Sequence, residues 1–208
     1  GIVDSCWTGT VWGHDHFAPE YTTVADPVLN IGDWEYLADK SPTNADSDSY
    51  ANAEGEPEYE AVLYSDRFGP DQLYLKKDGK LSLLSDKAFT DIRMTKHSIY
   101  GITADNTLLK INWETGKTVT LYTAKNGELD NMVFTEGYLY FTDGDQLIEA
   151  YIPMWRYRVL LEHPYISYVT VANLDTDHMS FYIRRGLAER AFIYCPITES
   201  LIETVPFP

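Results

Sequence analysis

The chain has 208 residues, 44% of them apolar, which is enough for one domain with a sizeable core and excludes disorder along the whole length. Acidic residues number 32 and basic residues 16. The resulting net charge of −16 argues against a nucleic-acid or anionic-membrane partner, since both polyanions would be repelled. No run of about 18 apolar residues occurs, so we expect no membrane insertion.

The amino-terminal part, residues 1–58, is irregular. Residues 8–12, 21–25 and 33–37 are short strand candidates. Residues 40–57 contain many Asp, Asn, Ser and Glu residues and two prolines, which predicts a long exposed acidic loop. Its acids lack the spacing of an EF-hand, so we favour a solvated loop over a calcium site at Asp46, Asp48, Glu54 and Glu56.

One short cluster in this part, His14-Asp15-His16, has the pattern of metal ligands. Histidines at positions i and i+2 point to the same side of a strand and could share a metal ion with a third ligand such as Glu20. The alternative, which we favour, is an exposed turn after Trp12-Gly13. We therefore assign no metal and no cofactor.

An internal repeat begins after the acidic loop. An apolar residue followed by Tyr recurs four times, and the steps between these tyrosines are 36, 40 and 42 residues. The four residues are Tyr64, Tyr100, Tyr140 and Tyr182. Spacing this even indicates one structural unit repeated along the chain.

Each unit contains several short strand patterns separated by turns. The strand with the tyrosine is followed by second strands at 72–75, 107–111, 146–151 and 191–194, and by third strands at 80–84, 118–122, 157–161 and 201–205. A further strand precedes three of the tyrosines, at 91–95, 131–135 and 167–172. Four short strands per 40 or so residues are typical of a propeller blade.

The predicted fold is therefore all-β, a β-propeller of four-stranded antiparallel blades in a single domain over residues 1–208. We expect five blades, with four blades plus an amino-terminal arm as the alternative. Residues 59–85 would form one blade whose inner strand comes from before the acidic loop. Because an open ring leaves two unpaired edges, we expect one chain end to add a strand to the blade of the other end.

The segment Leu139-Tyr140-Phe141-Thr142-Asp143, with residues 147–150 and 158–161 after it, resembles the YWTD repeat of lipoprotein-receptor propellers. The repeat pattern over residues 59–205 is also similar to uncharacterised secreted bacterial propeller-repeat proteins. The resemblance implies a propeller scaffold used for recognising proteins or glycans. It also implies a structural role for the repeat aspartate, Asp143 and by extension Asp66, in bonding neighbouring backbone.

The two cysteines, Cys6 and Cys195, do not form a CxxC motif, so we expect no zinc site at them. Two buried free thiols are the favoured interpretation. A disulfide that fastens the first strand to the last is the alternative for an exported protein.

No nucleophile elbow and no phosphate-binding glycine loop occur, so we name no catalytic residue. Trp113 and Trp155 occupy matching turns of successive repeats, where they could bind a partner or stack on sugar rings; packing between blades is the favoured alternative. We expect a non-catalytic binding module of an exported bacterial protein, extracellular or in the cell envelope, its signal peptide removed. The partner would be a protein or a glycan. The alternatives are a glycan-active hydrolase or lyase with acids at the central channel, and a structural spacer.

Overall fold

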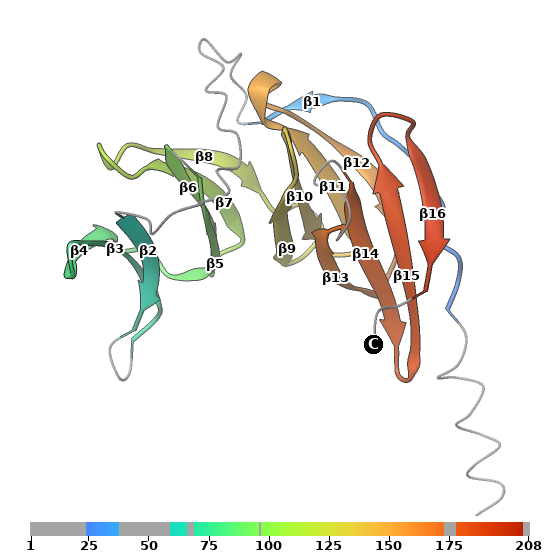
Figure 1. Cartoon of the computed structure of the whole chain (residues 1–208), viewed down its shortest axis with the longest axis horizontal. Helices are drawn as coiled ribbons and strands as arrows, with labels where there is room; N and C mark the ends of the chain where they lie inside the picture. Colours follow the sequence, from blue (N-terminus) through green and yellow to red (C-terminus); the bar gives the residue numbers. More distant parts are fainter. Residues whose placement is uncertain (1–23, 38–58, 66–68, 96, 173–177, 206–208) are drawn as a thin grey trace, which may run out of the picture.

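The computed structural model describes residues 24–37, 59–65, 69–95, 97–172 and 178–205. Nearly all of the regular structure in these residues is β (Figure 1). Four antiparallel sheets follow one another along the chain, and each is built mainly from strands that are consecutive in sequence. The predicted all-β class and the four-stranded unit are confirmed.

We call the four sheets the first to fourth blades. The first blade has three strands, β2 (Tyr59–Tyr64), β3 (Gln72–Lys77) and β4 (Lys80–Ser85). The second has β5 (Phe89–Met94), β6 (Ser98–Thr103), β7 (Thr107–Asn112) and β8 (Thr118–Thr123). The third has β9 (Leu129–Phe134), β10 (Tyr138–Asp143), β11 (Gln146–Tyr151) and β12 (Arg156–Glu162), with β1 (Glu35–Tyr36) added beyond β12. The fourth has β13 (Ile166–Val171), β14 (Met179–Arg185), β15 (Ala188–Cys195) and β16 (Ser200–Thr204).

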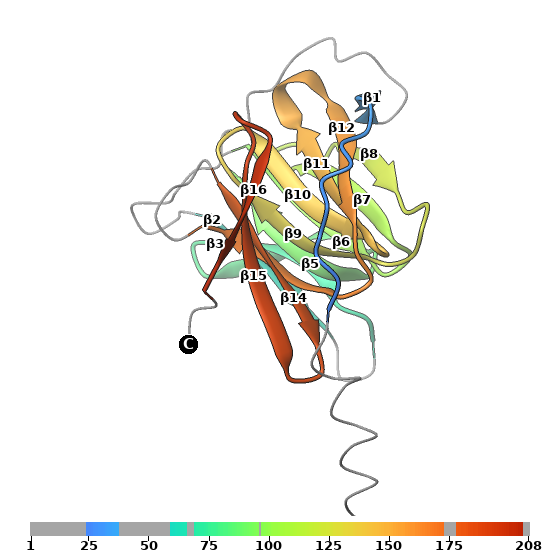
Figure 2. The same ribbon diagram turned by 90° about the vertical axis from the view of Figure 1, so that its right-hand side faces the viewer.

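The blades stack face to face with their first strands side by side. Strand β2 contacts β5, β5 contacts β9, and β9 contacts β13. Figures 1 and 2 show the four sheets fanning out from these strands. Consecutive blades that share an inner line of first strands are the arrangement of a β-propeller. The count of five blades stays a prediction, because residues 1–23 and 38–58 lie outside the described part.

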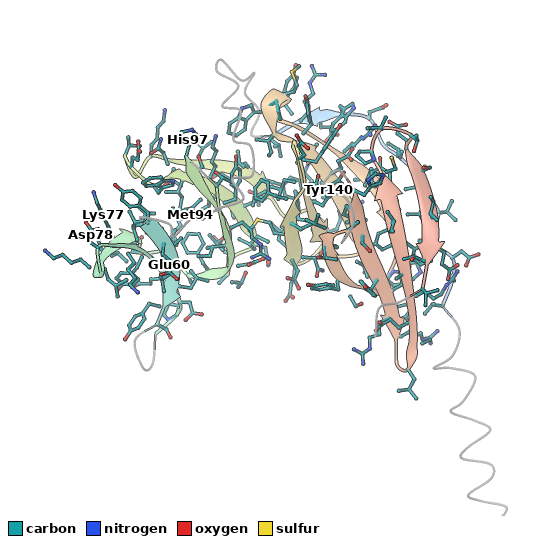
Figure 3. All side chains as sticks on the ribbon, in the orientation of Figure 1. Glu60, Lys77, Asp78, Met94, His97 and Tyr140 are labelled. Atoms are coloured by element: carbon teal, nitrogen blue, oxygen red, sulfur yellow. The ribbon has the colours of Figure 1, made fainter. Side chains whose placement is uncertain are left out.

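Alternation of side chains along the middle strands explains why the sheets stack. In β10, Leu139 and Phe141 enter the core between the second and third blades, while Tyr140 enters the core between the third and fourth. In β7, Leu108 faces the third blade and Leu109 the first. Middle strands are thus apolar on both faces, so each blade needs a neighbour on either side. Tyr140, labelled in Figure 3, lies inside the stack.

The turns follow from local residue chemistry. Strands β3 and β4 are joined by Asp78-Gly79, both with positive φ (50° and 75°), as a two-residue hairpin turn requires. Strands β14 and β15 are joined at Gly186, whose φ is 59°. The two strands form a hairpin in which Arg185 lies opposite Ala188.

The repeat tyrosines do not all occupy equivalent places. Tyr100 on β6 and Tyr140 on β10, the second strands of their blades, are fully buried and face the following blade. Tyr182 also lies on a second strand and has the same orientation, because Phe181 beside it faces the preceding blade. Tyr64 differs: it ends β2, the first described strand of its blade, and is 57% exposed. Its neighbour Leu63 faces the second blade, so the tyrosine points away from the stack.

Residues 24–37 cross the outer edges of the third and fourth blades instead of joining the first blade. Backbone amides of Asn30, Gly32 and Leu37 donate to carbonyls of the third blade at 2.7–2.8 Å. Leu37 is 1% exposed in the core between the second and third blades. The sequence expectation that residues before the acidic loop supply the inner strand of the first blade is therefore wrong for residues 33–37. Pairing with β12 satisfies their backbone at an edge that would otherwise be open.

Candidate functional site

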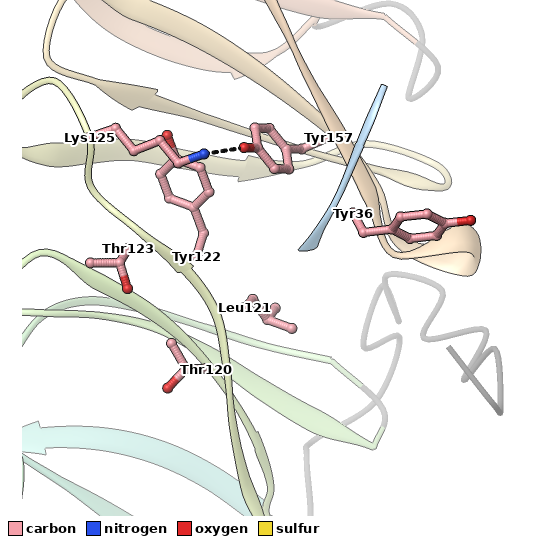
Figure 4. A pocket seen from close by; sticks show the side chains of 7 residues that line it. All are labelled: Tyr36, Thr120, Leu121, Tyr122, Thr123, Lys125 and Tyr157. Carbon is pink, nitrogen blue, oxygen red and sulfur yellow. Dashed lines mark hydrogen bonds between the residues drawn. The ribbon is translucent and has the colours of Figure 1, made fainter. Parts of the chain in front are cut away.

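A pocket opens between the outer strands of the second and third blades (Figure 4). Its volume is about 230 Å³. One wall comes from β8 and the loop after it, and the other from β12 and the added strand β1. The lining side chains are aromatic, hydroxyl-bearing or basic, with a single aliphatic residue among them: Tyr36, Thr120, Leu121, Tyr122, Thr123, Lys125 and Tyr157.

A chain of hydrogen bonds joins the two walls. The Lys125 ammonium donates to the Tyr157 hydroxyl at 2.6 Å, and that hydroxyl donates to the Glu35 carboxylate. Lys125 Nζ also lies 3.7 Å from Glu35 Oε2. The bond to Tyr157 raises the pKa of Lys125, while burial and the Glu35 carboxylate raise the pKa of Tyr157. At neutral pH the lysine is therefore charged and the tyrosine keeps its proton.

Asp143 holds the loop that carries Lys125. Its carboxylate is fully buried and accepts hydrogen bonds from the backbone amides of Lys125 (2.8 Å), Asn126 (3.0 Å) and Gly127 (3.1 Å). The Tyr122 hydroxyl donates to the same carboxylate at 2.5 Å. Burial and this acid raise the pKa of Tyr122. Four donors on one carboxylate fix the shape of the pocket wall.

The turn after Asp143 packs against the same loop. Gly144 has a φ of 55°, and a Cβ atom there would lie 2.8 Å from the carbonyl oxygen of Asn126. Only glycine combines this backbone conformation with so close an approach. The turn and the loop therefore form one compact unit beside the pocket.

The pocket offers stacking surfaces and hydrogen-bonding groups on a fixed frame. Tyr36 is 46% exposed, with the Arg156 guanidinium 4.9 Å from its ring centroid. The Lys125 ammonium lies 5.2 Å from the centroid of the Tyr157 ring and 5.7 Å from that of Tyr122. Tyrosine rings with hydroxyl and ammonium donors are typical of sites that recognise polar ligands by contact.

A second polar network is sealed between the third and fourth blades. Glu149 is 0% exposed and accepts from Arg158 Nε at 2.9 Å and from the Tyr140 hydroxyl at 2.7 Å. Arg158 also reaches Glu199 at 3.0 Å and lies over the Trp34 ring, 4.3 Å from its centroid. Burial raises the pKa of Glu149, and Tyr140 and Arg158 oppose that shift. The network joins the two blades; its Glu149 carboxylate is sealed from solvent, whereas the Glu199 side chain is half exposed at the surface.

The two tryptophans predicted as ligand contacts lie against the cores between blades. Trp113 packs on the core of the first and second blades, 4.5 Å from the Tyr59 ring. Trp155 packs on the core of the second and third blades with Lys110 Nζ 4.7 Å from its ring centroid. Both are partly buried rather than protruding, and neither lines the pocket. Their role in binding stays a prediction.

Sequence reasoning assigned no role to Glu35, Tyr122, Lys125 or Tyr157. Glu35 and Tyr157 are 122 positions apart and meet only because β1 adds to β12. No spacing rule links residues brought together by strand addition at a sheet edge. Tyr122 and Tyr157 lay within predicted strands. The prediction therefore placed each of them in a blade, but it did not show that the two side chains line the same pocket.

Several sequence-predicted sites lie outside the described residues: Cys6, Asp66, His14 to Glu20, and the acids of residues 40–57. Within the described ranges no group of three His, Cys, Asp or Glu side chains is placed to hold a metal ion. No helix in the same ranges is long and apolar enough to cross a membrane.

Cys195 lies at the end of β15, is partly buried and has no disulfide partner among the described residues. A hydrogen bond with the Thr198 side chain is the main cause that lowers the pKa of this thiol to about 7. Its pairing with Cys6 stays a prediction, because the other cysteine is outside the described residues.

No protein-family model matches the sequence, and no curated protein matches it either. Among solved structures, the chain is similar to the amino-terminal domain of Nup159, with 10% identity, a TM-score of 0.48, and coverage of 88% of this chain and 70% of that one. It is similar to an oligogalacturonate lyase from Vibrio parahaemolyticus, with 12% identity, a TM-score of 0.47, and coverage of 89% and 75%. A protein of unknown function from Bacteroides thetaiotaomicron has 14% identity and a TM-score of 0.46, and the match covers 86% of this chain and half of that one.

Proposed function

We propose that this chain is a non-catalytic binding module of an exported bacterial protein, located outside the cell or in the cell envelope. It presents one face of its propeller to a protein or glycan partner. The observation that carries the proposal is the pocket between β8 and β12, where Tyr36 is exposed and Lys125 is held by Tyr157 and Glu35. Such a site recognises by shape and hydrogen bonding, with little rearrangement on binding.

Kinship with the YWTD repeat is part of this proposal. The segment that resembles the repeat, residues 139–143, forms most of β10. Asp143 at its end bonds three neighbouring backbone amides, which is the role that the resemblance implies. The acidic composition favours a neutral or basic partner, because long-range attraction speeds association.

A glycan-active hydrolase or lyase is the second candidate function, and a structural spacer the third. The buried acid Glu149 favours the enzyme in one respect, since desolvation raises its pKa as it does for catalytic acids. Its carboxylate is 0% exposed and already bonded to Arg158 and Tyr140, so a substrate does not reach it in this conformation. We therefore place binding ahead of catalysis.

The test compares glycan and peptide arrays probed with the chain and two variants. Tyr36→Ala removes the exposed ring of the pocket, whereas Tyr64→Ala removes a similarly exposed ring on the first blade, away from the pocket. We expect spots on one array that Tyr36→Ala weakens at least tenfold and Tyr64→Ala leaves unchanged. Equal loss in both variants, or no binding on either array, would refute the proposal. Turnover of a bound glycan would favour the enzyme.

A further inference from the structure

The outer edge of β8 is open in the part of the chain that the structure describes. Strand β8 is the last strand of the second blade, and among the strands that the structure describes it pairs only with β7. The Lys117 carbonyl accepts from the Asn112 amide at 2.9 Å, which fixes the phase of the antiparallel ladder. Because inward and outward backbone groups alternate, the amides of Thr118 and Thr120 point away from β7. These groups form a template for another strand.

The molecule already shows strand addition at the corresponding edge of the next blade. There β1 pairs with β12, with Glu35 opposite Tyr157 and Tyr36 opposite Arg156. Farther along the same edge, the Gly32 amide donates to the Val159 carbonyl at 2.8 Å. The third blade is thus completed by a segment from elsewhere in the chain, while the second blade keeps its β8 edge unpaired among the described residues.

The pocket lies at the carboxyl end of this edge. Thr120, Leu121, Tyr122 and Thr123 all line it, so a strand added to β8 would pass its mouth. A peptide that pairs with β8 gains backbone hydrogen bonds along the edge and can place one side chain in the pocket. Main-chain pairing would supply affinity and the pocket would supply specificity.

We propose that the β8 edge binds an extended segment of a partner protein by strand addition, with one of its side chains in the pocket. This inference rests on the proposed binding function and narrows it to a peptide. The segment is neutral or basic, because the chain carries a net charge of −16. A β-strand pattern of alternating side chains follows from the pairing.

The experiment selects random twelve-residue peptides displayed on phage against the full chain, then measures the affinity of the best synthetic peptide. Thr120→Pro removes an outward amide of β8, and proline is tolerated at such an edge. Leu81→Pro is the matched control on the outer strand β4. The two-residue turn Asp78-Gly79 makes Lys77 and Lys80 a hydrogen-bonded pair, so the amide of the next residue, Leu81, points away from β3. We expect at least a tenfold weaker Kd for Thr120→Pro and no change for Leu81→Pro.

Hydrogen exchange supplies the second readout. In the free chain the Thr118 and Thr120 amides should exchange quickly, and saturating peptide should slow both at least tenfold. Protection in the free chain would overturn the proposal, because the edge would then be covered by another part of the chain or a second copy. Equal loss of affinity in both proline variants, or no selected peptide, would also overturn it. If the chain binds a glycan, Tyr36→Ala abolishes that binding and no peptide binds, the proposed function stands and this inference is refuted.

Discussion

Replacing Arg158 with methionine tests the buried network between the third and fourth blades. The substitution keeps much of the side-chain volume but leaves the Glu149 carboxylate, 0% exposed, without its cation. Removing one partner of a buried pair typically costs about 3–5 kcal/mol. With a urea slope of about 2–3 kcal/mol per molar, the unfolding midpoint should fall by roughly 1–2.5 M at pH 7.

The pH dependence identifies the cause. Burial holds the pKa of Glu149 above its usual value, and Arg158 opposes that rise, so the variant raises the pKa further. A carboxyl whose native pKa is raised binds its proton more tightly in the folded than in the unfolded state. Stability is then lost as the pH rises from the unfolded value toward the native one. The deficit of Arg158→Met should therefore be largest at pH 7 and shrink toward pH 4.

Urea unfolding monitored by tryptophan fluorescence at pH 4, 5.5 and 7 measures this. Glu149→Gln combined with Arg158→Met removes both charges and should recover at least half of the lost stability. Arg190→Met is the surface control, since Arg190 pairs with the more exposed Asp26 and Glu203, and the midpoint should change little. A deficit that is below about 1 kcal/mol, or equal at all three pH values, would refute the argument from a buried pair.

Three further predictions follow from the same contacts. Phe141→Ala should lower the free energy of unfolding by about 3–5 kcal/mol, since the ring is fully buried between two blades; a loss below about 1 kcal/mol in urea unfolding would contradict the core. Asp143→Ala should cost at least about 2 kcal/mol because three backbone amides and Tyr122 lose their acceptor, and Asp143→Asn should cost less; equal costs would show that hydrogen-bond acceptance is not the cause. The rate at which iodoacetamide alkylates Cys195 should rise with pH with a midpoint at about pH 7, and Thr198→Val should move this midpoint upward. If Cys195 reacts only after the chain is reduced, it is in a disulfide instead.

The repeat was visible in the sequence because it reflects a period in the backbone. The strand predicted at 146–151 matches β11 at both ends, and that at 118–122 falls within β8. Alternating apolar residues and glycine turns act locally, so local residues are enough to place the strands. The repeat pattern was misleading at Tyr64. The apolar residue before Tyr140 or Tyr182 faces the preceding blade, whereas Leu63 before Tyr64 faces the second blade, which follows its own.

The pocket could not be predicted in this way. It depends on where residues 24–37 run after the blades have formed, and a single backbone pairing decides that route. Asp143 was singled out by resemblance, but the four donors that meet on it come from Tyr122 and from residues 125–127 of a loop between two blades. Contacts that join separate repeats leave no periodic signal.

The central claim is that the blades stack face to face and bury aromatic side chains between them. Nuclear Overhauser contacts between ring protons test it most directly, in a chain with selectively labelled Tyr and Phe. Tyr100 on the second blade and Phe134 on the third have ring centroids 4.8 Å apart, and Tyr140 on the third and Tyr194 on the fourth are 6.3 Å apart. The account predicts cross-peaks for both pairs in the folded chain. Absence of both, with the contacts inside each blade still present, would contradict the stacked propeller.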